Sequence, residues 1–204
     1  MSDGARGGER ADAKRNRQRI IAAALDAFSA QESAGQETVA LEAIAREAGV
    51  GIGTLYRHFP SREALVEAVY RNELARLCDG ADELVDAMSP DRALRAWMGR
   101  YADFVATKRG MAEALREVIA SGAVTSTDTR QRLSAAVRTM LDAGAGESLR
   151  DDVPAEDVVA GLAGVLLACQ QPDQRQQVER LLDLLVDGLR PRAGSGSAEV
   201  RASS

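Results

Sequence analysis

The chain has 204 residues, enough for one large or two small domains around a hydrophobic core. Aromatic residues make up only 3% of it, and the abundance of Ala, Leu, Arg, Glu and Val favours helices over sheets. The formal net charge of −5 excludes a uniformly basic nucleic-acid-binding protein. However, residues 1–72 carry ten Lys/Arg and ten Asp/Glu, so the excess of acid lies wholly in residues 73–204. A local basic surface in the first third is therefore compatible with the overall acidity.

The sequence lacks the features of a membrane or secreted protein. No apolar run approaches the roughly 20 residues that span a bilayer. Residues 1–11 are polar, rich in Gly and Arg, and unlike a secretory signal. Cys78 and Cys169 lie far apart on predicted helices, which favours two buried free thiols over a disulfide or a metal site. We therefore expect a cytoplasmic protein with no membrane partner, no metal and no other cofactor.

The N-terminal part begins with residues 1–12, which we expect to be a disordered arm. A first helix follows over about residues 14–30, because apolar residues recur there at helical spacing. These residues are Ile20, Ile21, Ala24, Leu25 and Phe28. A basic run surrounds the start of this helix, interrupted only by Asp12, and consists of Arg10, Lys14, Arg15, Arg17 and Arg19. The run suits contact with DNA phosphates, and a solvated helix start is the alternative.

The most informative pattern follows the first helix. Residues 41–48 form a short amphipathic segment, which a break at Gly49 ends. A second short helix is expected over about residues 52–58. It stops before Pro60, because the residue preceding a proline is pushed out of the helical region, and Ser61 can cap the helix after it. Two short helices joined by a tight glycine turn are the plan of a helix-turn-helix, whose second helix enters the major groove of DNA.

The rest of the chain has the pattern of further helices, with no strand pattern. Ser89-Pro90-Asp91 is a strong start signal, because it combines a capping residue, a first-turn proline and an acid. Pro154 and Pro172 open two more helices in the same way. We expect helices over about residues 62–78, 90–110, 111–120, 127–144, 154–169 and 172–189, and a disordered tail over residues 191–204. For the first of these, a break at Asp79-Gly80 is expected, and a helical continuation through Leu84 and Val85 is the alternative. The sequence thus predicts an all-α fold.

The helix-turn-helix pattern resembles the signature of the TetR family of bacterial transcriptional regulators almost residue for residue. Residues 49–65 carry the resemblance with Gly-Val-Gly-Ile-Gly-Thr-Leu-Tyr-Arg-His-Phe-Pro-Ser-Arg-Glu-Ala-Leu, and residues 43–48 supply the usual preceding helix, Ala-Ile-Ala-Arg-Glu-Ala. The resemblance covers about residues 14–72. It implies an N-terminal three-helix DNA-binding domain of the helix-turn-helix type, residues 13–60. It also implies a C-terminal helical domain for ligand binding and dimerisation, residues 61–190.

The resemblance also implies a function. The chain would be a transcriptional regulator, by the family's default a repressor, that binds a palindromic operator in double-stranded DNA as a homodimer and is released by a small-molecule effector. A helix-turn-helix protein that binds DNA constitutively, without an effector, is the alternative. An enzyme has little support, because the single histidine, His58, lies inside the DNA motif and the sequence has no Cys/His cluster, phosphate loop or nucleophile elbow. We predict no catalytic residues.

Four residues are expected to contact the phosphates of the DNA backbone. Thr54 and Tyr56 match the family's Thr and Tyr that touch phosphates, and each hydroxyl can donate to a phosphate oxygen whatever the base sequence. His58, one turn after Thr54, can face the same DNA strand or simply face solvent. Arg62 stands where the family often has lysine, at a helix N-terminus that itself attracts phosphate.

The bases are expected to be read by the start of the second helix of the pair. Gly51, Ile52 and Gly53 occupy that position. The glycines let the backbone approach the groove closely, and Ile52 can contact a thymine methyl group. Arg57, further along, can reach either a guanine or only a phosphate.

Two residues depart from the family pattern. Gly51 stands where many members have Ser, and Ala40 stands where many have Ser or Thr before the first helix of the pair. A missing capping hydroxyl at Ala40 is expected to cost on the order of 1 kcal/mol.

The last two helices are the expected dimer interface. Ala160, Gly164 and Ala168 recur every four residues and would let a partner helix approach closely. The final helix carries a broad apolar face formed by Val178, Leu181, Leu182, Leu185 and Leu189. Intramolecular core is the alternative for both faces. Dimerisation would place two recognition helices about 34–36 Å apart, the spacing of successive major grooves.

The expected effector site lies in the C-terminal domain. Trp97, Tyr101 and Phe104 share one helical face, and Met140 and Leu162 can face them from other helices. Together they would line an apolar cavity with a few polar groups. An aromatic stripe at helical spacing is more often plain core, and that is the alternative.

Overall fold

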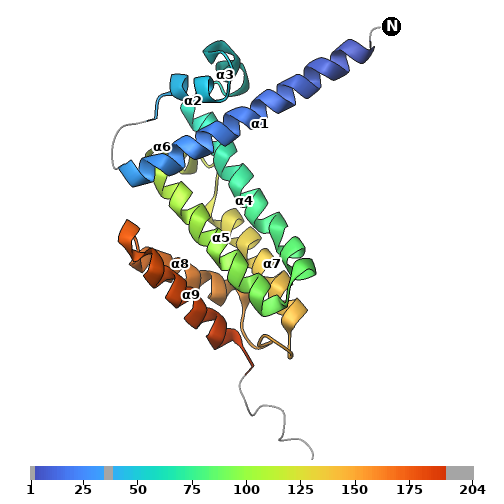
Figure 1. Ribbon diagram of the computed structural model, residues 1–204, viewed down its shortest axis with the longest axis vertical. Helices are drawn as coiled ribbons and strands as arrows, with labels where there is room; N and C mark the ends of the chain where they lie inside the picture. The colour runs from blue at the N-terminus through green and yellow to red at the C-terminus, as the bar shows by residue number, and fades with distance from the viewer. Residues whose placement is uncertain (1–2, 35–38, 192–204) are drawn as a thin grey trace, which may run out of the picture. The chain divides into compact units, whose positions relative to one another are not determined.

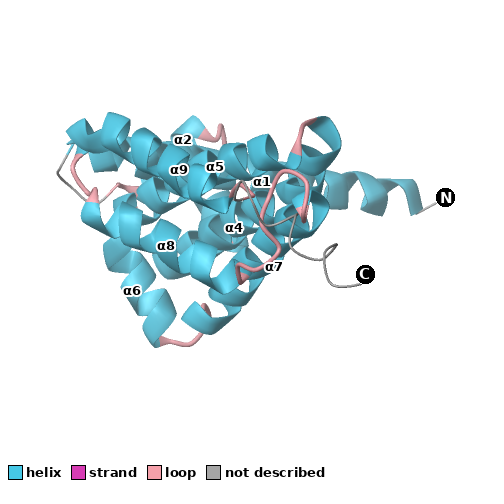
Figure 2. Cartoon of the chain, turned by 90° about the horizontal axis from the view of Figure 1, so that it is seen from below, coloured by secondary structure: helices cyan, strands magenta, loops and turns pink. Residues whose placement is uncertain are grey.

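The computed structural model describes residues 3–34 and 39–191. Within these ranges the chain consists of α-helices, one short 3₁₀ helix and loops, with no β-strand (Figures 1 and 2). The elements are α1 (Asp3–Ala34), α2 (Leu41–Glu47), α3 (Ile52–His58), α4 (Arg62–Ala87), α5 (Pro90–Gly110), α6 (Ala112–Ala120), α7 (Ser126–Gly144), α8 (Ala155–Ala168), the 3₁₀ helix η1 (Pro172–Gln174) and α9 (Arg175–Leu189). The predicted all-α fold is confirmed.

One helix boundary differs from the prediction, and another follows the alternative that the sequence left open. α1 begins at Asp3, so residues 3–12 are helical and not the expected disordered arm. Once a helix is nucleated, each further residue adds one hydrogen bond, and this segment has no proline to stop it. α4 does not break at Asp79-Gly80 but continues through Leu84 and Val85 to Ala87, as in the alternative. The expected tail, residues 191–204, lies outside the described residues except for Pro191.

The chain divides into two compact units, and α4 and α5 contribute residues to both. Unit 1 comprises Met1–Leu74 and Phe104–Ser126, and unit 2 comprises Ala75–Asp103 and Thr127–Ser204. Unit 1 therefore extends well past residue 60, where the sequence placed the end of the DNA-binding domain. Its two segments are joined by Tyr70 and Phe104, whose ring centroids lie 5.5 Å apart, and by Arg71, which donates to the Ala123 carbonyl at 2.6 Å.

The core of unit 1 forms where α1 packs against α2 and α3. The apolar stripe predicted on α1 is buried there except for Leu25, which is half-buried. Its fully buried members are Ile20, Ala24 and Phe28, and Ile44 of α2, Leu55 of α3 and Leu65 of α4 are buried in the same unit. Burial of these side chains fixes α3, whose seven residues could not stay helical alone.

Unit 2 is held together by buried apolar side chains and by ion pairs between α5 and α9. α5 begins at the predicted start signal. There Ser89 Oγ donates to Asp91 at 2.7 Å and holds the pKa of that carboxyl below its ordinary value. Arg95 pairs with Asp183 at 2.6 Å and with Glu179 at 2.5 Å, which ties α5 to the last helix.

Both cysteines are free thiols. Cys169 is buried and Cys78 is half-buried, and burial raises the pKa of the Cys78 thiol to about 11. The predicted burial of both thiols thus holds for Cys169 but not fully for Cys78. None of the helices over residues 3–34 and 39–191 combines the length and apolar character that a membrane span requires.

Candidate DNA-binding surface

The turn between α2 and α3 sets the angle between these helices. Gly49 has a φ of 62°, in the left-handed region that favours glycine. Its N–H donates to the Arg46 carbonyl at 3.0 Å, and the N–H of Val50 donates to the Ala45 carbonyl at 2.9 Å. This pair of bonds is the Schellman motif, which ends one helix and redirects the chain. The predicted glycine turn is confirmed.

An arginine of α1 secures the same turn. The Arg19 guanidinium donates to the carbonyls of Ala48 and Gly49, the latter at 2.9 Å. Carbonyl groups left free at a helix C-terminus favour a nearby cation. Arg19 belongs to the basic run expected to suit phosphate contact, whereas these bonds give it a structural role. Its partners lie 29 and 30 residues further along the chain, so no local pattern could reveal them.

α3 is anchored on one side by two buried residues. Leu55 and Phe59 are both buried and hold the helix against the core. The guanidinium of Arg17 in α1 lies over the Phe59 ring, 5.1 Å from its centroid. Such a cation–π contact fixes the end of α3 against α1.

The other side of α3 is open to solvent. Ile52 is 37% exposed and Tyr56 47% exposed, and Arg57 is also exposed. A Cβ atom added to Gly51 or Gly53 would meet nothing within 4 Å. The protein itself therefore does not require glycine at these two positions, and both leave the backbone bare on the exposed side of the helix.

Arg57 and Thr54 lie against each other on this surface. The Arg57 guanidinium donates to Thr54 Oγ1 at 2.9 Å, and Arg57 Nε donates to the Gly53 carbonyl at 3.4 Å. Because the Thr54 oxygen accepts this bond, its hydroxyl hydrogen stays available for an acceptor such as a phosphate oxygen. The structure thus brings together two residues that the sequence analysis singled out separately.

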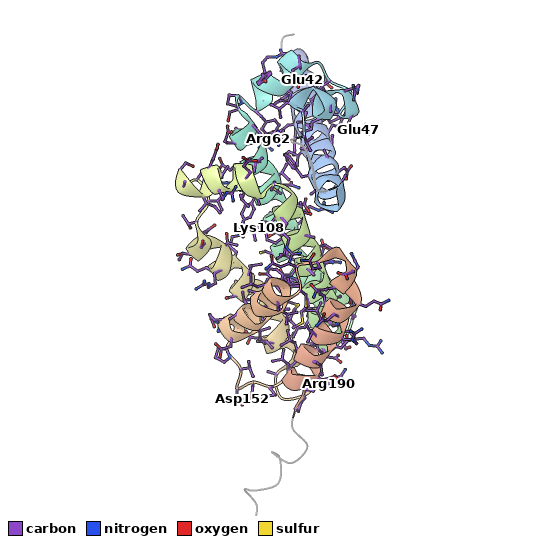
Figure 3. The ribbon with its side chains drawn as sticks, turned by 90° about the vertical axis from the view of Figure 1, so that its left-hand side faces the viewer. Glu42, Glu47, Arg62, Lys108, Asp152 and Arg190 are labelled. Atoms are coloured by element: carbon purple, nitrogen blue, oxygen red, sulfur yellow. The ribbon has the colours of Figure 1, made fainter. Side chains whose placement is uncertain are left out.

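His58 and Arg62, like Thr54, are half-buried, whereas the rest of the predicted set is exposed. His58 is half-buried, and its ring centroid lies 6.3 Å from that of Phe59. Arg62 opens α4, in the same part of unit 1 as Glu42 and Glu47 of α2 (Figure 3). It donates to the Val39 carbonyl at 2.6 Å and lies over the Phe28 ring at 5.7 Å. The contact predicted between Arg62 and a phosphate must therefore compete with internal partners.

The start of α4 is capped as predicted. Ser61 Oγ accepts a hydrogen bond from the Ala64 N–H at 3.2 Å. A hydrogen bond with Ser61 also lowers the pKa of the Glu63 carboxyl, so this acid stays ionised near the helix N-terminus. In contrast, α2 and α3 have Ala40 and Gly51 at their N-caps, which have no side-chain oxygen to accept such a bond.

The five predicted effector residues are all buried. Trp97 stacks on Tyr101 with ring centroids 5.8 Å apart, and the Trp97 Nε1–H donates to the Leu77 carbonyl at 2.9 Å. Met140 and Leu162 are fully buried in the same unit, unit 2. Phe104 belongs to unit 1, where it packs on Tyr70.

Unit 1 contains a pocket of about 230 Å³. Its lining is largely charged and comes from α4, the end of α5, α6 and the residue between α5 and α6, Met111. The lining residues are Arg62, Glu63, Gly110, Met111, Glu113, Ala114 and Glu117. None of the five predicted effector residues belongs to this lining.

α8 and α9 pack against each other and also present an outer apolar face. Leu167 is 71% exposed and Leu184 65% exposed, higher fractions than those of the other exposed large apolar residues described. The small residues Ala160, Gly164 and Ala168 of α8 are exposed as well. On α9, Val178, Leu182 and Leu189 are buried and Leu181 and Leu185 half-buried, so most of the predicted apolar face of α9 packs within the chain.

Two family descriptions match separate parts of the chain. Residues 20–69 match the bacterial regulatory proteins of the tetR family, and residues 89–191 match the C-terminal domain of SbtR-like transcriptional regulators. An HTH-type transcriptional regulator of Staphylococcus aureus is 43% identical over 65 residues, which is 32% of this chain. The match spans 34% of the length of that regulator, about one third.

Solved structures resemble the chain over most of its length. The TetR transcriptional regulator SCO0520 from Streptomyces coelicolor is 51% identical, with 87% of this chain and 99% of that one covered and a TM-score of 0.76. A TetR transcription regulatory protein from Mycobacterium vanbaalenii is 32% identical, with coverages of 89% and 99% and a TM-score of 0.69. The sequence signature, the helix-turn-helix geometry and these similarities agree, and the chain belongs to the TetR family of bacterial transcriptional regulators.

Proposed function

We propose that this protein is a repressor that binds a palindromic operator as a homodimer and leaves it when a small-molecule effector binds. The exposed side of α3 supports the first part of this proposal, the binding of DNA. It presents Tyr56, Arg57 and the bare backbone at Gly53, while Leu55 anchors the opposite side. A short helix held in this way can enter a major groove without losing its own support.

The contacts with DNA divide into two kinds. The hydroxyls of Thr54 and Tyr56 would donate to phosphates and fix the position of α3 on the duplex. Gly51, Ile52 and Gly53 would lie closest to the base edges, where Ile52 can meet a thymine methyl. His58 and Arg62 would add phosphate contacts at the end of α3 and the start of α4. The bond between Arg57 and Thr54 supports a phosphate contact for Arg57 over a contact with guanine.

The outer face of α8 and α9 supports the dimer. Burying a Leu side chain is worth about 1.5–3 kcal/mol, so Leu167 and Leu184 gain from a partner surface. A two-fold dimer would place the same face of a second copy against them, and the exposed small residues of α8 would allow close approach. The two copies of α3 could then occupy successive major grooves of a palindrome, about 34–36 Å apart.

Release by an effector requires two states of the dimer. A ligand that binds better when the two copies of α3 no longer fit successive grooves would lower the DNA affinity, typically by 1–3 kcal/mol. The apolar interior of unit 2 around Trp97, Tyr101, Met140 and Leu162 is the proposed place for it. Phe104, the fifth residue expected there from the sequence, belongs to unit 1 and is left out of this proposal. The complete burial of Trp97 and its bond to the Leu77 carbonyl favour the second candidate, a constitutive regulator whose aromatic stripe is plain core.

In-vitro selection tests the proposal. Purified full-length protein at about 150 mM salt is mixed with fragmented genomic DNA, and the retained fragments are sequenced. We expect a palindrome whose half-sites are centred about 10–10.5 base pairs apart, or a multiple of that spacing. Retention of fragments without a shared motif, by a protein that is folded and dimeric, would contradict sequence-specific binding in the effector-free state.

A further inference from the structure

Two arginines of α1 contact the two ends of the segment that carries α3. Before α3, Arg19 donates to the carbonyls of Ala48 and Gly49 through the same atom, Nη2. After α3, the guanidinium of Arg17 lies over the ring of Phe59, the C-cap of this helix. α3 itself has only seven residues and no side-chain hydrogen bond at its N-cap. Its orientation therefore depends on the contacts that hold its two flanks.

The places of these arginines on α1 make the two contacts complementary. α1 is one continuous helix that runs past α2 and α3 (Figure 1). Residues two apart in a helix lie about 200° apart around its axis, so Arg17 and Arg19 reach the flanks of α3 from different sides of α1. A rotation or a slide of the α2–α3 pair along α1 would therefore have to break at least one of the two contacts.

The turn between α2 and α3 is shaped to receive Arg19. Carbonyl groups at a helix C-terminus lack donors within the helix, and the two N–H groups of one guanidinium nitrogen can serve two of them. A Cβ atom at Gly49 would lie 2.5 Å from Arg19 Nη2. Glycine is therefore required at this position twice, once for its φ of 62° and once for the room that it leaves to the guanidinium.

The position of α3 matters more for reading bases than for attraction to the DNA backbone. Directional contacts hold only when the groups that make them stay within about 0.5 Å and 10–20° of the right geometry. The attraction between a basic side chain and the phosphates instead extends over about 10 Å at 0.1 M salt. A loosely held α3 should thus lose the recognition of bases well before the protein loses its attraction to DNA of any sequence.

We propose that Arg17 and Arg19 are positioning residues, which hold α3 at the angle needed to read bases and so set the preference of the protein for its operator. This inference rests on the proposed function, because it assumes that α3 enters the major groove. Loss of either arginine should lower the affinity for the operator and spare the affinity for random DNA. Loss of a phosphate contact would instead weaken binding to every sequence and reduce its salt dependence.

The test compares full-length variants in which one arginine becomes methionine, which keeps an unbranched stem and a high helix propensity. Arg19→Met and Arg17→Met each remove one contact. Arg15→Met is the matched control, because it removes the same charge from an exposed arginine of α1 that pairs with Asp12. The probes are an operator fragment selected by the wild-type protein and a random duplex of about 30 base pairs, each titrated at several salt concentrations. Urea denaturation checks that each variant is folded.

We expect Arg19→Met to lower the ratio of operator affinity to random-DNA affinity by about tenfold, the effect of one lost base contact. Its affinity for random DNA, and the slope of log affinity against log salt, should equal those of Arg15→Met. Arg17→Met should show the same pattern, and it tests the proposal by itself if Arg19→Met does not fold.

A double-mutant cycle shows whether Arg19 acts through the turn. Asparagine tolerates the left-handed backbone of Gly49, but its side chain would enter the space of the Arg19 guanidinium. Gly49→Asn should therefore lower the operator preference of the wild-type protein and have little further effect in Arg19→Met. Losses that simply add would show that the two residues act independently, against the proposal.

Two other results would overturn the assignment. Equal losses on both probes, with a salt slope reduced by about 1.8 for a dimer, would make Arg19 a phosphate contact. An Arg19→Met protein with the operator preference of Arg15→Met would leave Arg19 without a part in recognition. Failure of the proposed function is distinct from both, because the wild-type protein would then show no preference among DNA sequences.

Discussion

Arg57 is the residue of α3 whose partner the structure identifies most directly. It donates to Thr54 Oγ1, so its cation lies beside the hydroxyl expected to bind a phosphate. We expect Arg57→Ala to weaken binding to operator and random DNA alike, and to reduce the salt slope by about 1.8 for a dimer. Fluorescence anisotropy at several salt concentrations measures both quantities. Arg130→Ala, an exposed arginine of α7, is the control.

A different result would reassign Arg57. Unchanged affinity for random DNA together with a relaxed preference at one position in each half-site, worth about 1–3 kcal/mol, would make it a reader of guanine.

Ala40 offers a second prediction at the residue scale. It is exposed and has the extended backbone of an N-cap, φ −72° and ψ 136°, before α2. Ala40→Ser should therefore supply the missing acceptor and stabilise the protein by about 1 kcal/mol. Urea denaturation measures the change in the free energy of unfolding. Ala22→Ser, at an exposed position inside α1, should instead destabilise by a few tenths of a kcal/mol because serine is a poorer helix former. Equal effects at the two positions would contradict a capping role.

Sequence reasoning succeeded at this scale where the cause was local. The Gly49 turn, the Ser61 cap and the buried anchors Leu55 and Phe59 all follow from a few neighbouring residues. It missed the internal roles of Arg19 and Arg62, whose carbonyl partners lie 23 to 30 residues away. A basic residue near a DNA-binding motif gives no local sign of whether it faces phosphate or protein.

At the scale of elements, α1 and the end of α5 approach each other unusually closely within unit 1. A Cβ atom at Gly110 would lie 2.0 Å from the Phe28 carbonyl oxygen, and backbone atoms cannot move aside as a flexible side chain can. We expect Gly110→Ala to destabilise the protein by about 1–3 kcal/mol, the usual effect of overpacking. Thermal or urea unfolding measures it.

Gly53 is the matched control for Gly110. A Cβ atom there would meet open space, so Gly53→Ala should stabilise α3 by up to about 1 kcal/mol. If both substitutions shifted stability in the same direction, the close contact between α1 and α5 would not be what constrains Gly110.

Trp97 tests whether the aromatic stripe of α5 is core or ligand site. It is fully buried, stacked on Tyr101 and hydrogen-bonded to the Leu77 carbonyl. Trp97→Ala should lower the free energy of unfolding by about 3–5 kcal/mol, as large-to-small core changes do. Trp97→Phe keeps an aromatic ring and should lower it much less. A Trp97→Ala protein of wild-type stability that lost only its effector response would instead identify a ligand site.

The order and type of the helices could be predicted because most of them have an apolar period, and several, such as α4 and α5, also have a start signal. The length of α1 could not, since its first turns lack the apolar spacing by which helices are recognised. The limits of unit 1 were missed for another reason. Phe104 joins it through Tyr70, a contact across 34 residues that helical periodicity does not encode.

At the scale of the whole molecule, the proposed dimer depends on the outer face of α8 and α9. We expect Leu167→Glu combined with Leu184→Glu to yield a monomer, because each partner would then have to bury charges without counterions. Sedimentation velocity measures the mass in solution. Ile119→Glu is the control: this residue of α6 is 40% exposed and should leave the dimer intact. A dimer that survives the double substitution would place the interface elsewhere.

The central claim is that the two copies of α3 in a dimer bind successive major grooves of one operator. Hydroxyl-radical footprinting of the selected operator tests it most directly, with the wild-type protein beside a Thr54→Ala/Tyr56→Phe variant. We predict two protected patches on one face of the duplex, related by a two-fold axis and centred about 34–36 Å apart, both weakened in the variant. A single patch, or protection that the variant leaves unchanged, would contradict the claim.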